Sequence, residues 1–203
     1  DAGKVIVRPD EALLEQYRER QRQAAERERL LARLADVACV TQDGCRVTML
    51  ANIERPEEAE DAVRAGAEGI GLFRSEFLFL NRCQLPDEEE QYRAYRQVLE
   101  TLQGRPVTIR TIDVGADKIL PAQALIPGAT SALGRRAIRY SLAEPEMFLV
   151  QLRALLRASV HGNLQILLPM LTQPHEVDEA MLLLAQARQD LAPLVEDPHH
   201  VTI

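Results

Sequence analysis

The sequence predicts an α/β fold built on a parallel sheet, and three observations lead to this prediction. From about residue 47 onward, short apolar runs alternate with amphipathic stretches in the order strand, helix, strand, helix. The apolar runs are nearly continuous, which is typical of parallel strands covered on their faces. With 203 residues, 46% of them hydrophobic, the chain is long enough to bury a substantial core around such a sheet.

Two architectures fit four strand–helix units that are followed by the start of a fifth strand. One is the front half of a (β/α)8 barrel of the TIM type, and the other is an open, doubly wound sheet. Periodicity does not decide between them. No GxGxxG or GxxxxGK(S/T) motif follows any predicted strand, which removes the strongest support for a nucleotide-binding open sheet. The barrel is therefore slightly favoured.

The amino-terminal part is predicted to be a long, solvated helix over about residues 10–35, preceded by a short β-like run at 5–7 that ends before Pro9. Asp10 is placed as the helix cap. Residues 15–29 alternate acids with bases and contain few apolar side chains, so most of the helix should face water. An ordinary surface helix and a linker between domains fit this pattern about equally.

A hairpin is predicted next, because Gln42-Asp43-Gly44 lies between β-prone residues 37–41 and 45–50, and Asp-Gly is a preferred hairpin turn. The remaining expected elements are strands at 47–53, 69–73, 107–112, 165–171 and from 201, and helices at 56–65, 87–102, 144–160 and 174–191.

Composition argues against several classes of protein. A formal net charge of −7 does not suit a nucleic-acid binder that neutralises phosphates. No apolar run approaches the roughly 20 residues that span a bilayer, so membrane insertion is not expected. The cysteines form no CxxC pair and the histidines have no metal-ligand spacing, which predicts a reducing cytoplasm and no disulfide or zinc site. These residues are Cys39, Cys45, Cys83, His161, His175, His199 and His200.

Two arginines stand at the carboxyl ends of neighbouring predicted strands. Arg74 follows the run at 69–73, and Arg110 lies near the end of the run that begins at 107. In a barrel this end of the strands handles the substrate, and two guanidinium groups would converge there on one carboxylate or phosphate. The alternative is a structural salt bridge for each, Arg74 with Glu76 or Arg110 with Asp113.

A third basic group, Arg135, Arg136 and Arg139, precedes a predicted helix, whose amino terminus would add anion-binding donors. A solvated basic turn is the competing interpretation. Gly115 permits a tight turn after the strand that begins at 107, and Lys118 would reach a phosphate as a point charge.

Three blocks of sequence resemble the signature blocks of the phosphoenolpyruvate-protein phosphotransferases, the enzyme I family of the bacterial sugar phosphotransferase system. The blocks are GIGLFRSEFLFL at 69–80, TIRTIDVGADK at 108–118 and LGRRAIR at 133–139, with further similarity in KVIVRPD at 4–10, QLRALLRAS at 151–159 and ILLPM at 166–170. Two positions depart from the family pattern: Thr130-Ser131-Ala132 replaces Asn-Pro-x, and Gly115-Ala116 replaces a glycine pair.

The resemblance implies transfer of the phosphoryl group of phosphoenolpyruvate to an enzyme histidine, and then to the carrier protein HPr, with Mg²⁺ assisting. Arg74 and Arg110 would hold the phosphate and carboxylate of phosphoenolpyruvate and Arg136 would add a phosphate contact, with Lys118 and Asp113 in support. The phosphorylated histidine is expected before Asp1, and the Mg²⁺ ligands and a proton-donating cysteine after Ile203. No catalytic or metal-binding residue is therefore assigned in this chain, which alone should be inactive.

The resemblance also implies an organisation. Residues 1–36 would be the end of the phosphohistidine domain with its linker helix, and residues 37–203 the amino-terminal part of a truncated phosphoenolpyruvate-binding barrel. The full-length protein would be a homodimer, and half a barrel should aggregate or dimerise because its strand edges are uncovered. Two other functions stay open: a related enzyme such as a pyruvate phosphate dikinase, or a non-catalytic regulatory or dimerisation module.

Overall fold

The computed structural model describes residue 3 and residues 5–80, 82, 84–113, 134–192 and 201–203. It divides into two compact units, one of residues 1–47 with 64–66 and the other of residues 48–63 with 67–203.

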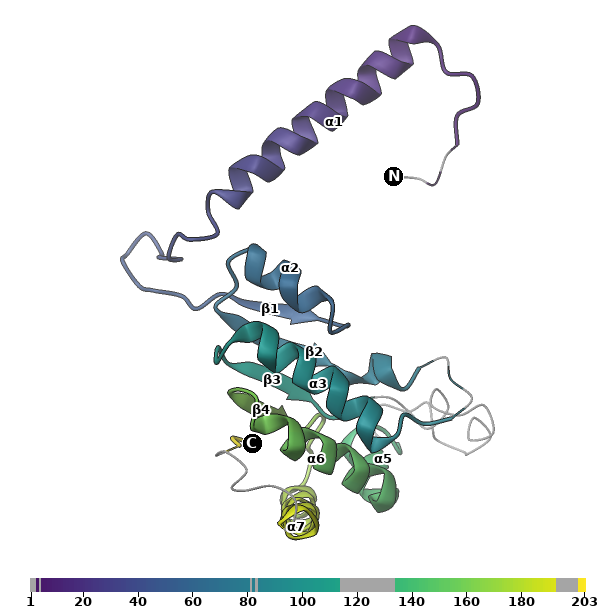
Figure 1. The fold of residues 1–203 in the computed structure, drawn as a ribbon, viewed down its shortest axis with the longest axis vertical. Helices are drawn as coiled ribbons and strands as arrows, with labels where there is room; N and C mark the ends of the chain where they lie inside the picture. Colours follow the sequence, from purple (N-terminus) through teal and green to yellow (C-terminus); the bar gives the residue numbers. More distant parts are fainter. Residues whose placement is uncertain (1–2, 4, 81, 83, 114–133, 193–200) are drawn as a thin grey trace. The chain divides into compact units, whose positions relative to one another are not determined.

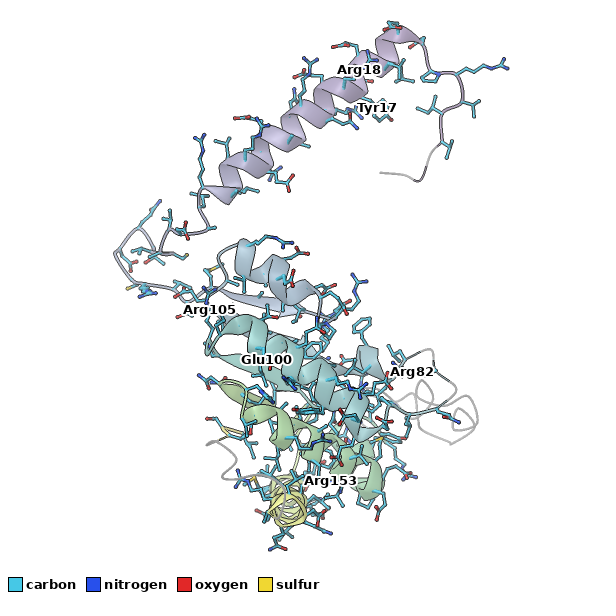
Figure 2. All side chains as sticks on the ribbon, in the orientation of Figure 1. Tyr17, Arg18, Arg82, Glu100, Arg105 and Arg153 are labelled. Atoms are coloured by element: carbon cyan, nitrogen blue, oxygen red, sulfur yellow. The ribbon has the colours of Figure 1, made fainter. Side chains whose placement is uncertain are left out.

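The first unit contains the long charged helix that the sequence predicts. Helix α1 spans Glu11–Ala32, and the Asp10 carboxylate caps it by accepting a hydrogen bond from the Leu13 N–H at 2.8 Å. None of its residues is buried, and Figure 2 shows its side chains projecting on every side. The prediction of a solvated helix is confirmed.

Two β-like segments of this unit do not form regular strands. Residues 5–7 lie outside any strand, and Val5 and Val7 are largely exposed. The Asp-Gly turn does form, with the Thr41 N–H donating to the Cys45 carbonyl at 2.9 Å, but only one antiparallel bridge flanks it. The predicted hairpin strands are therefore wrong. The apolar side chains flanking the turn are half-exposed and so gain little from pairing.

The second unit is built on a four-stranded, all-parallel sheet. Its strands are β1 (Leu50–Ile53), β2 (Gly69–Arg74), β3 (Val107–Arg110) and β4 (Leu164–Leu167). They follow one another in the spatial order β1-β2-β3-β4, and Thr202 makes a further parallel bridge to Gln165 beside β4 (Figure 1). The predicted α/β class and parallel sheet are confirmed, although β1, β3 and β4 are shorter than expected.

Helices follow each strand, as the alternating pattern predicts. They are α2 (Glu58–Arg64), α3 (Glu88–Leu102), α6 (Pro145–Ser159) and α7 (Pro174–Leu191). Two short elements were not predicted, the 3-10 helix η1 (Ser75–Leu78) and helix α5 (Ile138–Ala143). Elements of four and six residues complete too few turns to produce a helical period in the sequence.

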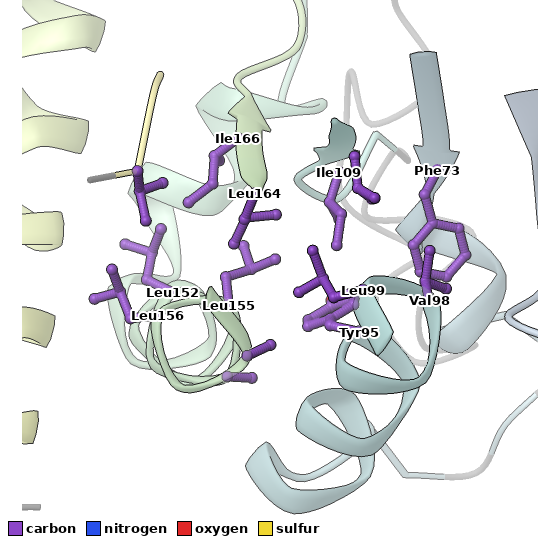
Figure 3. Packing of buried hydrophobic residues seen from close by; sticks show 14 of the residues in the cluster. Phe73, Tyr95, Val98, Leu99, Ile109, Leu152, Leu155, Leu156, Leu164 and Ile166 are labelled. Carbon is purple, nitrogen blue, oxygen red and sulfur yellow. The ribbon is translucent and has the colours of Figure 1, made fainter. Parts of the chain in front are cut away.

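One apolar core joins the sheet to its helices. Phe73 of β2 packs edge-on against Tyr95 of α3, with ring centroids 6.1 Å apart. Leucines of α3 and α6 lie between these helices and the strands (Figure 3). Buried residues from all four strands and from α2, α3, α6 and α7 belong to the same cluster, so these helices cover one face of the sheet. Among the described helices, none combines the length and the apolar character needed to cross a membrane.

Helix α7 begins with a capping box around a buried carboxylate. One oxygen of Glu176 accepts hydrogen bonds from the N–H groups of Thr172 at 2.6 Å and Gln173 at 2.9 Å, and Arg139 lies 3.7 Å away. Burial raises the pKa of the Glu176 carboxyl, but these hydrogen bonds and Arg139 outweigh it and hold the pKa below its ordinary 4.5. The ionised form is thus part of the helix cap.

Replacing Glu176 with glutamine is expected to lower the free energy of unfolding by about 1–2 kcal/mol at pH 7, because a charged acceptor of two N–H groups becomes a neutral one. The folded pKa of Glu176 is depressed, so its contribution is complete above about pH 4.5 and is lost as the pH falls through the folded value. Urea unfolding at pH 7 and pH 3 measures both effects. Glu179→Gln, at an exposed position of α7, is the control. A difference that does not change with pH would contradict this prediction.

Candidate anion-binding site

The two arginines predicted from the sequence lie side by side. Arg74 ends β2, Arg110 ends β3, and the two are direct partners in the parallel pairing. The residues before them, Phe73 and Ile109, are fully buried in the core. Because side chains alternate along a strand, both arginines point to the sheet face opposite the helices. The predicted juxtaposition at the carboxyl ends of β2 and β3 is thus present in the fold.

Arg110 is held by two carboxylates. Its Nη2 pairs with Glu76 of η1, and its Nη1 lies 2.9 Å from the Asp113 carboxylate. The side chain of Arg110 is 20% exposed, and those of Glu76 and Asp113 are 8% and 10% exposed. In such a site, where water is scarce, an ion pair with good geometry holds its partners in one orientation. Arg110 is therefore fixed before any ligand arrives.

Arg136 joins the same group through Asp113, whose second oxygen lies 3.3 Å from the Arg136 Nε. Arg139 faces elsewhere, because its Nε donates to the Gly134 carbonyl at 2.9 Å and its Nη1 to the Met170 carbonyl at 3.2 Å. It links the start of α5 to the segment after β4. Arg135 lies 3.6 Å from the Glu144 carboxylate, so Arg136 is the member of the third basic group that joins Arg110 through Asp113.

A chain of buried hydrogen bonds fixes the backbone beneath Arg110. The Ser75 hydroxyl donates to the Arg110 carbonyl at 2.6 Å. The Gln151 side chain, from α6, donates to the Ser75 hydroxyl at 3.1 Å and accepts from the Ile112 N–H at 3.1 Å. Ser75 and Gln151 are almost completely buried. The end of β3 is therefore tied both to η1 and to the helix layer.

The hydrogen-bond chain continues into α3. Gln151 also donates to the Tyr95 hydroxyl at 3.1 Å, and that hydroxyl donates to Gln91 at 3.2 Å. Burial raises the pKa of Tyr95 far above its ordinary value, more than its hydrogen bonds lower it. The hydroxyl stays protonated at any physiological pH, so it remains a donor to Gln91.

Arg74 is paired differently, with an acid from the end of β1. Its Nη1 lies 2.6 Å from the Glu54 carboxylate, and the two side chains are 38% and 42% exposed. The backbone of Glu54 is held in turn by Glu58, which accepts from the N–H groups of Glu54 at 2.8 Å and Arg55 at 3.3 Å. The hydrogen bond from the Glu54 N–H above all, together with those from the Arg55 side chain and backbone, outweighs burial and lowers the pKa of Glu58.

The structure corrects one expected salt bridge. Arg74 pairs with Glu54 instead of Glu76, because the turn of η1 directs Glu76 across to Arg110 on the next strand. The salt bridge of Arg110 with Asp113, the alternative expected from the sequence, is present, and Arg110 pairs with Glu76 as well. Lys118 lies outside the described residues.

Sequence reasoning missed Glu54 and Gln151. Gln151 had a signal, since it is a polar residue on the buried face of an amphipathic helix. Glu54 had none, because its partner is 20 residues away in the sequence.

A cavity of about 500 Å³ opens at the opposite, amino-terminal end of the strands. Its described lining includes the polar side chains of Gln103, His161 and Asn163 but no arginine, lysine or acid. Among the described residues, the arginine cluster offers an anionic ligand charged partners and this cavity does not, so the cluster is the better candidate site.

A parallel sheet with helices on one face and arginines at its carboxyl edge is suited to binding small anions. Comparison with known proteins shows the family to which the chain belongs. The model of the phosphoenolpyruvate-binding domain of the phosphoenolpyruvate-utilising enzymes matches residues 28–201. The chain belongs to this family, and the resemblance seen in its sequence is confirmed.

Similar proteins include three bacterial phosphoenolpyruvate-protein phosphotransferases. The one from Cupriavidus necator is 52% identical over 194 residues, that from Geobacillus stearothermophilus 44% over 189 residues, and that from Bacillus subtilis 41% over 189 residues. These matches cover 93–94% of this chain. The chain spans about a third of the length of each relative, since the matches cover 33% of them.

Proposed function

We propose that this chain forms the phosphoenolpyruvate-gripping part of a phosphoenolpyruvate-protein phosphotransferase. The observation that carries the proposal is the pairing of Arg74 with Arg110 on adjacent strands, with Arg136 joined to them through Asp113. It is supported by 52% identity to a phosphotransferase over 94% of this chain. One buried donor, the Arg110 Nε, has no hydrogen-bond partner among the described residues and would suit a ligand oxygen.

The chemistry fits three guanidinium groups. Phosphoenolpyruvate carries a phosphate and a carboxylate, and arginine binds either with two parallel N–H donors. When the phosphoryl group moves, its bond to the enol oxygen breaks as a bond to a histidine nitrogen forms, and the enolate leaves with the electron pair and later takes a proton. Fixed cations stabilise the negative charge that develops on the phosphoryl oxygens and the enolate. Arg74, Arg110 and Arg136 would do this, with Lys118 and Asp113 in support.

The histidine and the final acceptor are proposed to lie outside this chain, the histidine in a segment before Asp1 and the acceptor on an HPr-type carrier protein. Mg²⁺ is proposed from the family resemblance. The described residues do not fit a metal site, because no three or more His, Cys, Asp or Glu side chains gather in a way that would hold an ion. On the family resemblance we propose metal ligands beyond Ile203, and we assign no step to a metal here.

We propose that the sheet is the front half of a (β/α)8 barrel. Its strands follow one another without the reversal of order found in doubly wound sheets, and its helices share one face. Residues 1–36 would then be the end of the phosphohistidine domain with its linker, and residues 37–203 the first part of the barrel. We also propose that the full-length protein is cytoplasmic and forms a homodimer.

The test is calorimetric titration of phosphoenolpyruvate into this chain, with and without Mg²⁺, beside the double variant Arg74→Lys and Arg110→Lys. Lysine keeps the charge that the neighbouring acids need but cannot form a bidentate contact. The double variant is expected to bind at least about 100-fold more weakly, since a hydrogen bond to a charged group contributes about 1.5–3 kcal/mol.

Arg96→Ala, an exposed arginine of α3 that pairs with Glu100, is the control and should bind as the unchanged chain does. Equal affinity for the double variant and the unchanged chain would contradict the proposed site. Upstream sequence distinguishes the remaining alternatives: a phosphohistidine segment favours the phosphotransferase and an ATP-grasp region favours a dikinase.

A further inference from the structure

The two strand-end arginines and Arg136 do not by themselves present a positive surface, because each is matched by an acid. Arg74, Arg110 and Arg136 face Glu54, Glu76 and Asp113, so their formal charges cancel. A ligand with a phosphate and a carboxylate carries close to three negative charges. Among the described residues, this group gains a net positive charge toward such a ligand when one of the carboxylates gives way.

The acids differ in how easily they can leave. Glu76 and Asp113 are 8% and 10% exposed, and separating either from Arg110 would leave a charge in a place that water scarcely reaches. Glu54 is 42% exposed, and its partner Arg74 is 38% exposed. Exposed ion pairs are weak because water solvates both ions when they separate. Glu54 is therefore the carboxylate that can be exchanged.

Local structure keeps Glu54 beside Arg74 even though the pair is weak. The Glu58 carboxylate binds the Glu54 N–H at 2.8 Å, and the side chain of Glu58 also accepts from the Arg55 Nε at 3.1 Å. This fixes the turn between β1 and α2, so the side chain of Glu54 is attached to an anchored backbone next to the end of β2. A carboxylate held in this way has a high effective concentration at Arg74.

We propose that Glu54 is a specificity-determining residue that competes for Arg74 as an internal anion. A singly charged anion such as acetate offers Arg74 no more than Glu54 does and fails to displace it. A phosphorylated carboxylate also reaches Arg110 and Arg136, and these added contacts drive the exchange. The identity of the ligand rests on the proposed function, whereas the competition rests on the Glu54–Arg74 pair.

The experiment compares the unchanged chain with Glu54→Gln and with Glu57→Gln, a matched control at an exposed position three residues along. Circular dichroism first verifies that all three fold alike. Titration at constant ionic strength is expected to show phosphoenolpyruvate binding about 3- to 10-fold more tightly to Glu54→Gln. This gain corresponds to the free energy of the exposed Glu54–Arg74 ion pair and to the repulsion between Glu54 and the ligand, both of which the substitution removes. Acetate should compete measurably in Glu54→Gln and far less in the other two proteins.

A second readout needs no phosphoenolpyruvate. Phenylglyoxal modifies accessible guanidinium groups, and peptide mass spectrometry gives its rate at Arg74. We expect this rate to rise at least about threefold in Glu54→Gln and to stay unchanged in Glu57→Gln, since an arginine released from an exposed pair reacts as a free one.

The outcomes separate the two proposals. Equal modification rates at Arg74 in all three proteins would overturn the role of Glu54, as would a faster rate with unchanged phosphoenolpyruvate affinity. If no protein binds phosphoenolpyruvate, the proposed function fails. In that case protection of Arg74 by inorganic phosphate decides about Glu54: stronger protection in Glu54→Gln supports the competition, and equal protection refutes it.

Discussion

Replacing Arg110 with alanine is expected to lower the free energy of unfolding by about 3–5 kcal/mol, the loss typical of removing one partner from a buried ion pair. Glu76 would lose the guanidinium that compensates it, and Asp113 would keep only Arg136. One oxygen of Glu76 already has no hydrogen-bond partner among the described residues, so little else is available to stabilise it. Urea unfolding at pH 7, followed by circular dichroism, measures the loss.

A companion variant tests the cause. When both members of a buried pair become apolar, the cost is often small, because no charge is left uncompensated. Arg110→Met combined with Glu76→Leu should therefore recover part of the stability lost in Arg110→Ala, although Asp113 remains. A loss below about 1 kcal/mol in Arg110→Ala would instead mean that the pair behaves like an exposed one. This result also guides binding experiments, in which lysine is the safer replacement.

The second large effect is expected at Gln151, which touches no ligand in the proposed site. Gln151→Leu should lower the free energy of unfolding by about 2–4 kcal/mol, since each buried polar group left without a partner costs about 1–3 kcal/mol. Leucine fills a similar volume, but the Ile112 N–H loses its acceptor, and Ser75 and Tyr95 each lose a donor. Urea unfolding measures the change, and amide hydrogen exchange at Ile112 should accelerate most.

Tyr95→Phe provides the comparison for Gln151. It removes the hydroxyl between Gln151 and Gln91 but leaves the hydrogen bonds of Gln151 to Ser75 and Ile112 in place. Its expected cost is about 1 kcal/mol, close to that of a single hydrogen bond. If Tyr95→Phe and Gln151→Leu proved equally costly, the link from α6 to the end of β3 would not be the important one.

Long elements with a strong period were predictable. Helix α7 begins and ends where the sequence pattern places it, at Pro174 and Leu191, because Pro174 suits a first turn and the apolar spacing continues to the end. Helix α3 likewise starts directly after the cap Asp87. Apolar runs overestimated the strands: β4 stops at Leu167, although the apolar run continues to residue 171. An apolar run indicates that its residues are buried. A strand, in contrast, ends where the neighbouring strand no longer offers hydrogen-bond partners.

The candidate site was likewise predictable only in part. Arg74 and Arg110 were predictable because each ends an apolar run, and equivalent ends of parallel strands must meet at one edge of the sheet. The partners of these arginines were not. Glu76 lies two residues from Arg74 but binds Arg110, since the turn of η1 carries it across the sheet edge.

The sequence by itself therefore determined the α/β class, the parallel sheet, the arginines at its carboxyl edge and the family. These follow from hydrophobic periodicity and from short motifs, which are properties of neighbouring residues. Tertiary structure alone decided that Glu54 holds Arg74, that Asp113 joins Arg110 to Arg136, and that Gln151 anchors the backbone beneath Arg110. Each of these contacts joins groups on different elements, and its strength depends on burial and on distances that appear only once the helices have packed against the strands.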